Sequence, residues 1–165
     1  MVNSNTPETV YIDVSNQMLR VQKGSKIVFN TQISTAKKGV GERFGSEQTP
    51  RGWHIVRAKI GESELENRVF VGRRATNELY TEDLSAQYPE RDWILSRILW
   101  LSGLELGFNR LGDVDTMRRY IYIHGCPDSI KMGEAGSHGC IRMRNKDVIQ
   151  LFDMLDVGTK VLIAE

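Results

Sequence analysis

The sequence predicts a mostly β domain with one helix near its C-terminal end. Short runs of β-branched and aromatic residues, separated by turn-forming residues, recur from residue 9 onward and indicate strands. A helical apolar period stands out once, where Val148, Leu151 and Phe152 share one face. A length of 165 residues fits one compact domain. We therefore expect a flexible leader over residues 1–8 and a single domain over residues 9–165.

The first third of the chain is expected to form an antiparallel meander and a long loop. Glycines and polar residues fill positions 36–52, and a loop of this length inside a domain is usually functional. We therefore expect it to border a site. The strands predicted in this part cover residues 9–14, 18–21, 26–29, 53–56 and 58–60, and residues 32–35 could continue the meander.

The middle of the chain gives weaker signals. Residues 77–84 have faint helical spacing, which ends at Tyr88-Pro89. Residues 93–101 form an apolar run of nine residues. We interpret this run as a buried strand, with a short helix as the alternative.

The C-terminal part gives clearer signals. Residues 119–124 predict a strand that ends at His124, and residues 159–163 predict a last strand. Between them, residues 145–155 predict the helix, with Asn145 as its N-cap.

Composition and charge exclude several classes of protein. The chain has 22 basic and 21 acidic residues, a net charge of +1, so nothing favours a nucleic-acid partner. No apolar run of membrane-spanning length and no secretory signal is present in the sequence. We therefore expect a cytoplasmic protein with no membrane partner, or a periplasmic one if a leader has been removed. The sequence does not predict an oligomeric state.

The residues that indicate chemistry are concentrated in one stretch, Ser137-His138-Gly139-Cys140-Ile141-Arg142. A thiol with a histidine near it is the minimum equipment of a cysteine nucleophile. We predict that Cys140 is the nucleophile, in an exposed turn. The backbone N–H groups of His138, Gly139 and Cys140 could stabilise an oxyanion.

His124 is the better candidate for the base, because the end of a strand is a rigid platform for an imidazole. We give His138 an orienting or oxyanion-side role, and interpret His54 as structural. Arg142 is placed to hold a substrate carboxylate. Cys126 is more simply a small, partly buried residue.

A zinc site is the alternative interpretation of the same residues. It would use the four residues His124, Cys126, His138 and Cys140. Their two His-x-Cys units match the usual spacings of structural zinc poorly. We therefore predict no metal and no cofactor.

These motifs resemble the catalytic domain of the L,D-transpeptidases, the YkuD family. The resemblance is carried by His124 and by Ser137-His138-Gly139-Cys140 followed by Arg142. The resemblance extends to residues 12–17, 34–39, 49–52 and 151–163. It therefore covers nearly the whole chain from about residue 9.

The resemblance implies a β-sandwich or barrel with a short helix behind the cysteine. It implies that Cys140 is the nucleophile, that His124 is the base, and that the carbonyl of Gly125 orients the imidazole. Substrate binding is assigned to Arg142 and Ser137. The family attacks the bond between meso-diaminopimelate and a terminal D-alanine in a peptidoglycan tetrapeptide stem, leaving a thioester on the cysteine.

The acceptor of that thioester decides the activity. With no route out of the cytosol, water is the expected acceptor, and the leading hypothesis is an L,D-carboxypeptidase that trims soluble muropeptides for recycling. A periplasmic L,D-transpeptidase that forms cross-links or exchanges D-amino acids is the alternative. A muropeptide-binding or zinc-binding domain is the alternative in which the protein is not an enzyme.

Overall fold

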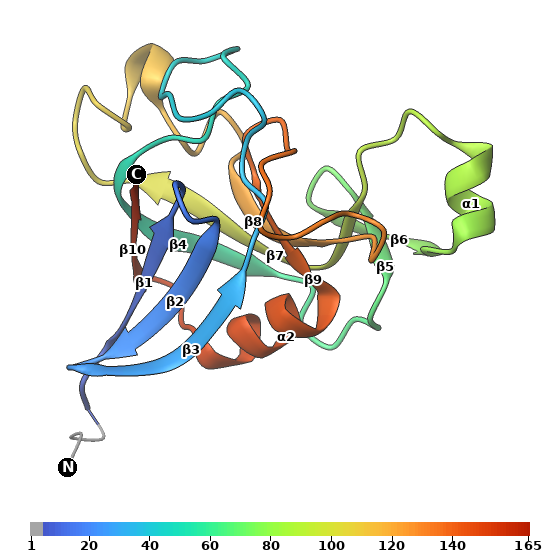
Figure 1. Cartoon of the computed structure of the whole chain (residues 1–165), viewed down its shortest axis with the longest axis horizontal. Helices are drawn as coiled ribbons and strands as arrows, with labels where there is room; N and C mark the ends of the chain where they lie inside the picture. Colours follow the sequence, from blue (N-terminus) through green and yellow to red (C-terminus); the bar gives the residue numbers. More distant parts are fainter. Residues whose placement is uncertain (1–4) are drawn as a thin grey trace.

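The computed structural model describes residues 5–165, which form one branched, strongly curled β-sheet with a helix against its inner face (Figure 1). The strands are β1 (Glu8–Asp13), β2 (Met18–Lys23), β3 (Lys26–Gln32), β4 (Gly52–Ile60), β5 (Arg68–Val71), β6 (Arg74–Leu79), β7 (Ile94–Gly103), β8 (Tyr122–Cys126), β9 (Ile141–Arg144) and β10 (Lys160–Ala164). The helices are α1 (Glu82–Gln87), the short 3₁₀ turn η1 (Gly112–Val114) and α2 (Asn145–Met154).

The strand order is β3-β2-β1-β10-β4-β7-β5-β6, with β8 branching from β7 and β9 from β8. Most neighbours are antiparallel, and short turns join β1 to β2, β2 to β3 and β5 to β6. The parallel pairs are β1 with β10 and β8 with β9. The long strand β7 pairs with β4 and β8 through the same residues 98–100 and with β5 through residues 94 and 95, so it joins the branches of the sheet.

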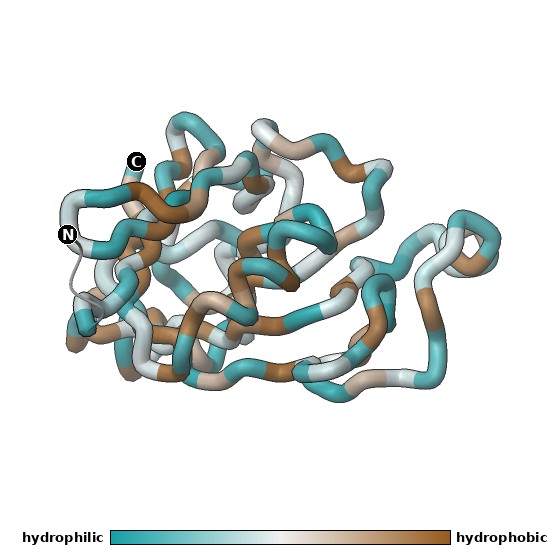
Figure 2. The backbone as a smooth tube through the Cα atoms, turned by 90° about the horizontal axis from the view of Figure 1, so that it is seen from below, coloured by the Kyte–Doolittle hydropathy of each residue, from teal (hydrophilic) through white to brown (hydrophobic). Residues whose placement is uncertain are grey.

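The hydrophobic core lies inside the curl of the sheet. α2 packs its buried residues Val148, Leu151 and Phe152 against the inner faces of β7, β8 and β9. In Figure 2, hydrophobic and hydrophilic segments alternate along the backbone. Burial of such side chains contributes roughly 1.5–3 kcal/mol each, and it fixes α2 directly behind the strands that carry the predicted site.

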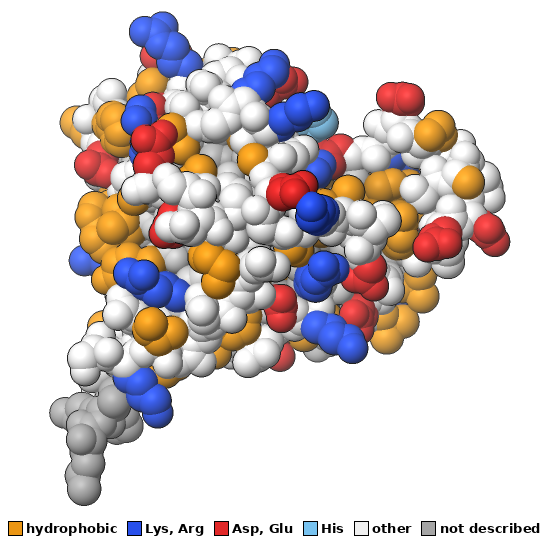
Figure 3. Space-filling view, viewed as in Figure 1, with side chains coloured by type: hydrophobic (Ala, Val, Ile, Leu, Met, Phe, Trp, Pro, Cys, Tyr) orange, Lys and Arg blue, Asp and Glu red, His pale blue; other side chains and the backbone are white. Residues whose placement is uncertain are grey.

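A polar arm extends from one side of this body. The β5–β6 hairpin, α1 and the return segment to β7 form it, and α1 has no buried residue. Figure 3 shows the arm standing away from the main body, with a notch between them. Arg91 anchors the return segment by pairing with Glu78 and by lying 4.3 Å from the ring centroid of Trp93. No helix within residues 5–165 is both long and apolar enough to cross a membrane.

The predicted fold class is confirmed: a mostly β, curled half-barrel with α2 following the cysteine. The strand interpretation of residues 93–101 is also confirmed. The expected leader, residues 1–8, falls partly outside the described residues, and β1 begins at Glu8.

Three local predictions were wrong. The faint helix over residues 77–84 is instead the end of β6 followed by α1 at Glu82, capped by the Thr81 hydroxyl. The strand expected from residue 119 begins only at Tyr122, because Tyr120 has a positive φ of 56° within a turn. Arg144, not Asn145, is the N-cap of α2, since the amide of Asn145 is used elsewhere.

Candidate active site

The predicted site residues lie on two neighbouring parallel strands. β8 pairs with β9 so that Ile123 lies beside Ile141 and His124 beside Arg142. Successive side chains of a strand point to opposite faces. Ile123 and Ile141 are in the hydrophobic core, so His124 and Arg142 face the other side. Cys140 comes two residues before Arg142, and the same alternation brings it to the face of His124.

The thiol of Cys140 lies against the start of β8. Its sulfur accepts a hydrogen bond from the Tyr122 N–H and donates one to the Tyr120 carbonyl, both at 3.4 Å. Burial raises the pKa of the thiol to about 11, although the Tyr122 N–H acts in the opposite direction. The expectation of an exposed thiol is therefore corrected: Cys140 is half-buried against Tyr122, and it is neutral at pH 7. A base must take its proton before it can attack.

His124 has the properties of that base. It is buried, and its Nδ1 lies 2.7 Å from the carbonyl oxygen of Gly125. Because a carbonyl only accepts hydrogen bonds, Nδ1 carries the proton and Nε2 keeps a free lone pair. Burial also lowers the pKa of the imidazole, which the Gly125 hydrogen bond and the Asp92 charge oppose. The ring is thus neutral at pH 7 and able to accept a proton at Nε2.

Gly125 itself is required by packing. A Cβ at this position would lie 2.3 Å from the side-chain oxygen of Asn145 and 2.5 Å from the carbonyl oxygen of Leu95. The Asn145 amide also donates to the Cys126 carbonyl at 3.0 Å and accepts from the Ser96 hydroxyl at 2.7 Å. These buried bonds are the physical reason that Asn145 does not cap α2. They join α2 and β7 to the strand that carries His124.

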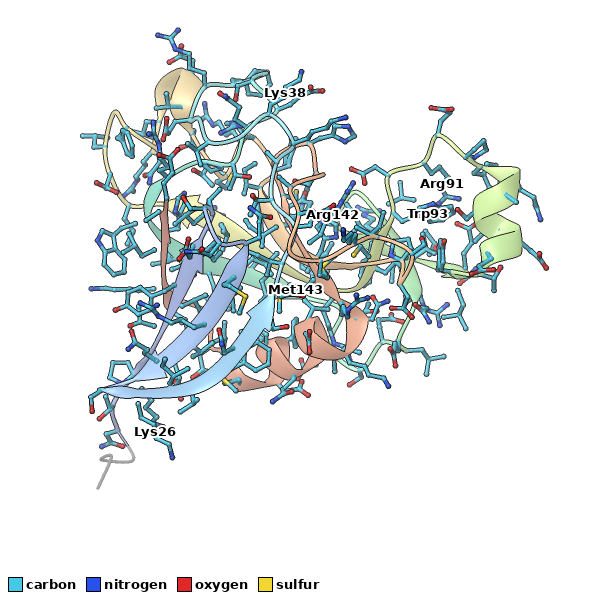
Figure 4. The ribbon with its side chains drawn as sticks, in the orientation of Figure 1. Lys26, Lys38, Arg91, Trp93, Arg142 and Met143 are labelled. Atoms are coloured by element: carbon cyan, nitrogen blue, oxygen red, sulfur yellow. The ribbon has the colours of Figure 1, made fainter. Side chains whose placement is uncertain are left out.

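Arg142 is bound by groups of the protein itself. Its Nη2 donates to Asp92 Oδ1 at 2.8 Å, and its Nη1 donates to the Gly136 carbonyl at 3.1 Å. Burial raises the pKa of Asp92, but the charge and hydrogen bond of Arg142 outweigh this and lower it below its usual range. The carboxylate also lies 3.5 Å from Nδ1 of His138, whose side chain is exposed. Figure 4 shows Arg142 between the sheet and the return segment that carries Arg91 and Trp93.

The turn before Cys140 is held from inside. Ser137 is buried, and its hydroxyl donates to the Cys140 carbonyl and accepts from the Gly139 N–H at 3.2 Å. Gly139 has φ of +135°, which side-chain-bearing residues rarely adopt. From the long 36–52 loop, the Thr49 hydroxyl donates to the Gly139 carbonyl at 2.9 Å. The loop therefore borders the site.

The structure brings together most of the predicted residues and adds one that the sequence did not indicate. Cys140, His124 and Arg142 share one face, whereas Ser137 is occupied inside the turn. The Gly139 N–H is likewise engaged in the turn rather than directed at a substrate. Asp92, fifty positions before Arg142, was missed because no local motif marks it. A cavity of about 190 Å³ lies beside it, between β5 and residues 91–94.

The four residues of the zinc alternative do not form a cluster. Cys126 is buried, directs its thiol to the Met143 carbonyl at 3.3 Å, and has its pKa raised to about 11 by burial. His138 is exposed and faces Asp92. Over residues 5–165, no group of three or more His, Cys, Asp or Glu side chains is arranged to hold a metal ion. His54 is buried and bonded to the Gly52 carbonyl and the Thr116 hydroxyl, both at 3.0 Å.

A curled sheet that presents a neutral thiol and a neutral imidazole on one face has the arrangement of a cysteine nucleophile with a histidine base. The family model described as "YkuD: L,D-transpeptidase catalytic domain" matches residues 7–163. The chain belongs to this family.

Solved structures and curated relatives agree with this placement. The L,D-transpeptidase from Mycobacterium smegmatis superposes with a TM-score of 0.62 at 18% identity, covering 96% of this chain and 59% of that one. A mutant of the Enterococcus faecium L,D-transpeptidase gives 0.58 at 18% identity, covering 96% and 50%. At these identities the likeness concerns the fold.

Among curated proteins, the L,D-transpeptidase homologue YqjB of Bacillus subtilis is 42% identical over 60 residues, 36% of this chain and 32% of that protein. The homologue YkuD of the same organism is 46% identical over 46 residues, 28% of each chain. The match thus covers about a third or less of the length of these curated relatives, and 50–59% of the length of the two solved chains.

Proposed function

We propose that the protein is a cysteine-dependent L,D-carboxypeptidase, which removes the terminal D-alanine from peptidoglycan tetrapeptide stems and acts in muropeptide recycling in the cytoplasm. The observation that carries this proposal is the pairing, on one face of β8 and β9, of a neutral Cys140 thiol with a neutral His124 whose Nε2 is free. Family membership supplies the substrate class.

The proposed reaction proceeds in two halves. Nε2 of His124 takes the thiol proton as the sulfur attacks the carbonyl of the L-centred diaminopimelate residue, forming a tetrahedral oxyanion. The N–H groups of His138 and Cys140 stabilise that oxyanion. The C–N bond then breaks, His124 returns the proton to the departing amine, and D-alanine leaves. A thioester remains on Cys140.

Water completes the cycle. His124 takes a proton from a water molecule, whose oxygen attacks the thioester carbonyl, and the C–S bond breaks to release the tripeptide and the thiol. Asp92 of the arm binds Arg142 and lies near His138 of the turn, so the arm and the turn contact each other beside this site. The products of the reaction distinguish water from the amine of a second stem as the acceptor.

The test is mass spectrometry of a tetrapeptide muropeptide incubated with the protein, with and without excess D-amino acid. We expect tripeptide and free D-alanine alone. Cys140→Ala and His124→Ala should each abolish turnover, while Cys126→Ala, which removes the other thiol, should retain it. Abundant cross-linked dimer or exchanged D-residue would establish the transpeptidase alternative. Full release by either site variant would overturn the role of that residue.

A further inference from the structure

The Arg73 guanidinium has a defined position and forms no salt bridge with an acidic side chain of the described residues. Arg73 lies in the tight turn between β5 and β6, where Val71 pairs with Arg74. Its Cζ is 4.7 Å from the ring centroid of Trp100 and 4.9 Å from that of Tyr120. Its Nη1 donates to the Tyr122 hydroxyl at 3.1 Å. Stacking and one hydrogen bond therefore fix the plane of an exposed cation.

Three other arginines around the site are paired with carboxylates. Arg142 binds Asp92, Arg68 binds Glu64 and Arg91 binds Glu78. No Asp or Glu within the described part of the chain forms a salt bridge with Arg73, and its raised pKa arises from Tyr122 and Tyr120. A guanidinium that is held in place without a counter-ion is a ready site for a carboxylate, which it can bind through two parallel hydrogen bonds.

The residues beneath Arg73 also contact the nucleophile. Tyr122 donates its backbone N–H to the Cys140 sulfur and accepts from Arg73 at its hydroxyl. Tyr120 accepts from the thiol at its carbonyl and lies under the guanidinium with its ring. Tyr122 therefore contacts the thiol with its backbone N–H and the cation with its hydroxyl, so one residue connects the two groups. In a peptide, the terminal carboxylate belongs to the residue directly after the scissile carbonyl, so it would extend toward Arg73 while that carbonyl meets the thiol.

We propose that Arg73 binds the carboxylate of the terminal D-alanine and thereby selects stems with a free C-terminus. This inference rests on the proposed function. The sequence had indicated Arg142 for a substrate carboxylate, but Asp92 and the Gly136 carbonyl occupy the Arg142 guanidinium. D-alanine takes its carboxylate with it when it leaves, so Arg73 acts on formation of the thioester and not on its hydrolysis.

The experiment compares two substrates, the tetrapeptide stem and the same stem with its terminal carboxyl converted to an amide. We expect Arg73→Gln to lower kcat/KM about 10- to 100-fold on the acid, the worth of a charge-assisted hydrogen bond, and by less than about threefold on the amide. Arg73→Lys should recover part of the loss. The rate of hydrolysis of the preformed thioester should not change in either variant.

The matched control is Arg57→Gln. Arg57 also lies over the Trp100 ring, at 5.8 Å, but bonds to Ser102 rather than to Tyr122. The variant Arg57→Gln should leave kcat/KM unchanged on both the acid and the amide. An equal loss on acid and amide, or no loss in Arg73→Gln, would overturn the role of Arg73 while leaving the carboxypeptidase intact. Absence of D-alanine release by the wild-type protein would instead overturn the proposed function and this inference together.

Discussion

Replacement of Gly125 by alanine tests whether the backbone of β8 positions the base. The new Cβ would lie 2.5 Å from the Leu95 carbonyl oxygen and 2.3 Å from the Asn145 side-chain oxygen. Neither neighbour can retreat easily, because one is backbone of β7 and the other is held by three hydrogen bonds. The strand must therefore move, and with it the carbonyl that holds His124 Nδ1 at 2.7 Å.

The expected effects follow from that geometry. Inserting a methyl group into a packed site costs about 1–3 kcal/mol of unfolding free energy, and a misplacement of about 1 Å at a catalytic group lowers kcat by about 100-fold. We therefore expect Gly125→Ala to remain folded with its kcat reduced to about 1%. KM should change little, because Gly125 is buried within β8.

The assay is steady-state release of D-alanine, with urea unfolding of the same samples. Gly136→Ala is the control, since its Cβ would meet the Ser34 hydroxyl only at 3.5 Å, an ordinary contact, and it should keep the wild-type kcat within about twofold. If Gly125→Ala unfolds at a lower urea concentration but turns over at the wild-type rate, the Gly125 carbonyl does not position His124.

Three further predictions concern protons. The acid limb of the pH profile of kcat/KM should have its midpoint below pH 6.5, because burial lowers the pKa of His124. Asp92→Asn removes a charge that opposes this lowering, so it should move the midpoint to a still lower pH. A midpoint above pH 6.5 would contradict the assignment of His124 as the base. Alkylation of Cys140 by iodoacetamide should be slow at pH 7 and accelerate up to about pH 11, since burial raises its pKa to about 11; fast, pH-independent labelling would show a preformed thiolate. Burial lowers the pKa of His54 to about 4. Between pH 6.5 and 4 the unfolded chain therefore binds a proton that the native chain does not, and the free energy of unfolding decreases as the pH is lowered. Urea titrations at pH 5 should give a free energy of unfolding about 2 kcal/mol lower than at neutral pH, and His54→Gln should not show this decrease. An equal pH dependence of unfolding in both proteins would refute the prediction.

The sequence predicted the parts of the site that depend on local pattern. The strand predicted to end at His124 corresponds to β8, and the fold class followed from short runs of β-branched and aromatic residues separated by turn-forming residues. β9, whose pairing with β8 brings Arg142 beside His124, was not predicted.

The parts that the sequence did not predict depend on contacts distant along the chain. Asp92 reaches Arg142 across fifty positions, and its own neighbourhood is polar and irregular. The β5–β6 hairpin carries charged side chains on exposed positions, so its alternation is too weak to identify. Asn145 occupies a position that normally favours capping, but the buried Ser96 hydroxyl and Cys126 carbonyl use its amide instead.

The parallel pairing of β1 with β10 has a consequence for how the chain folds. The meander of β1, β2 and β3 is connected to the rest of the sheet through β10, residues 160–164. During synthesis the N-terminal meander therefore waits, with one edge unpaired, until almost the whole chain has left the ribosome. Closing such a distant pair raises contact order and slows folding toward the millisecond-to-second range. Removal of β10 should weaken the junction between the meander and the rest of the sheet, which the bridges Ser34–Arg142 and Ala36–Ser137 still connect. A nascent chain stalled before residue 160 should bind chaperones through the open edge of β1.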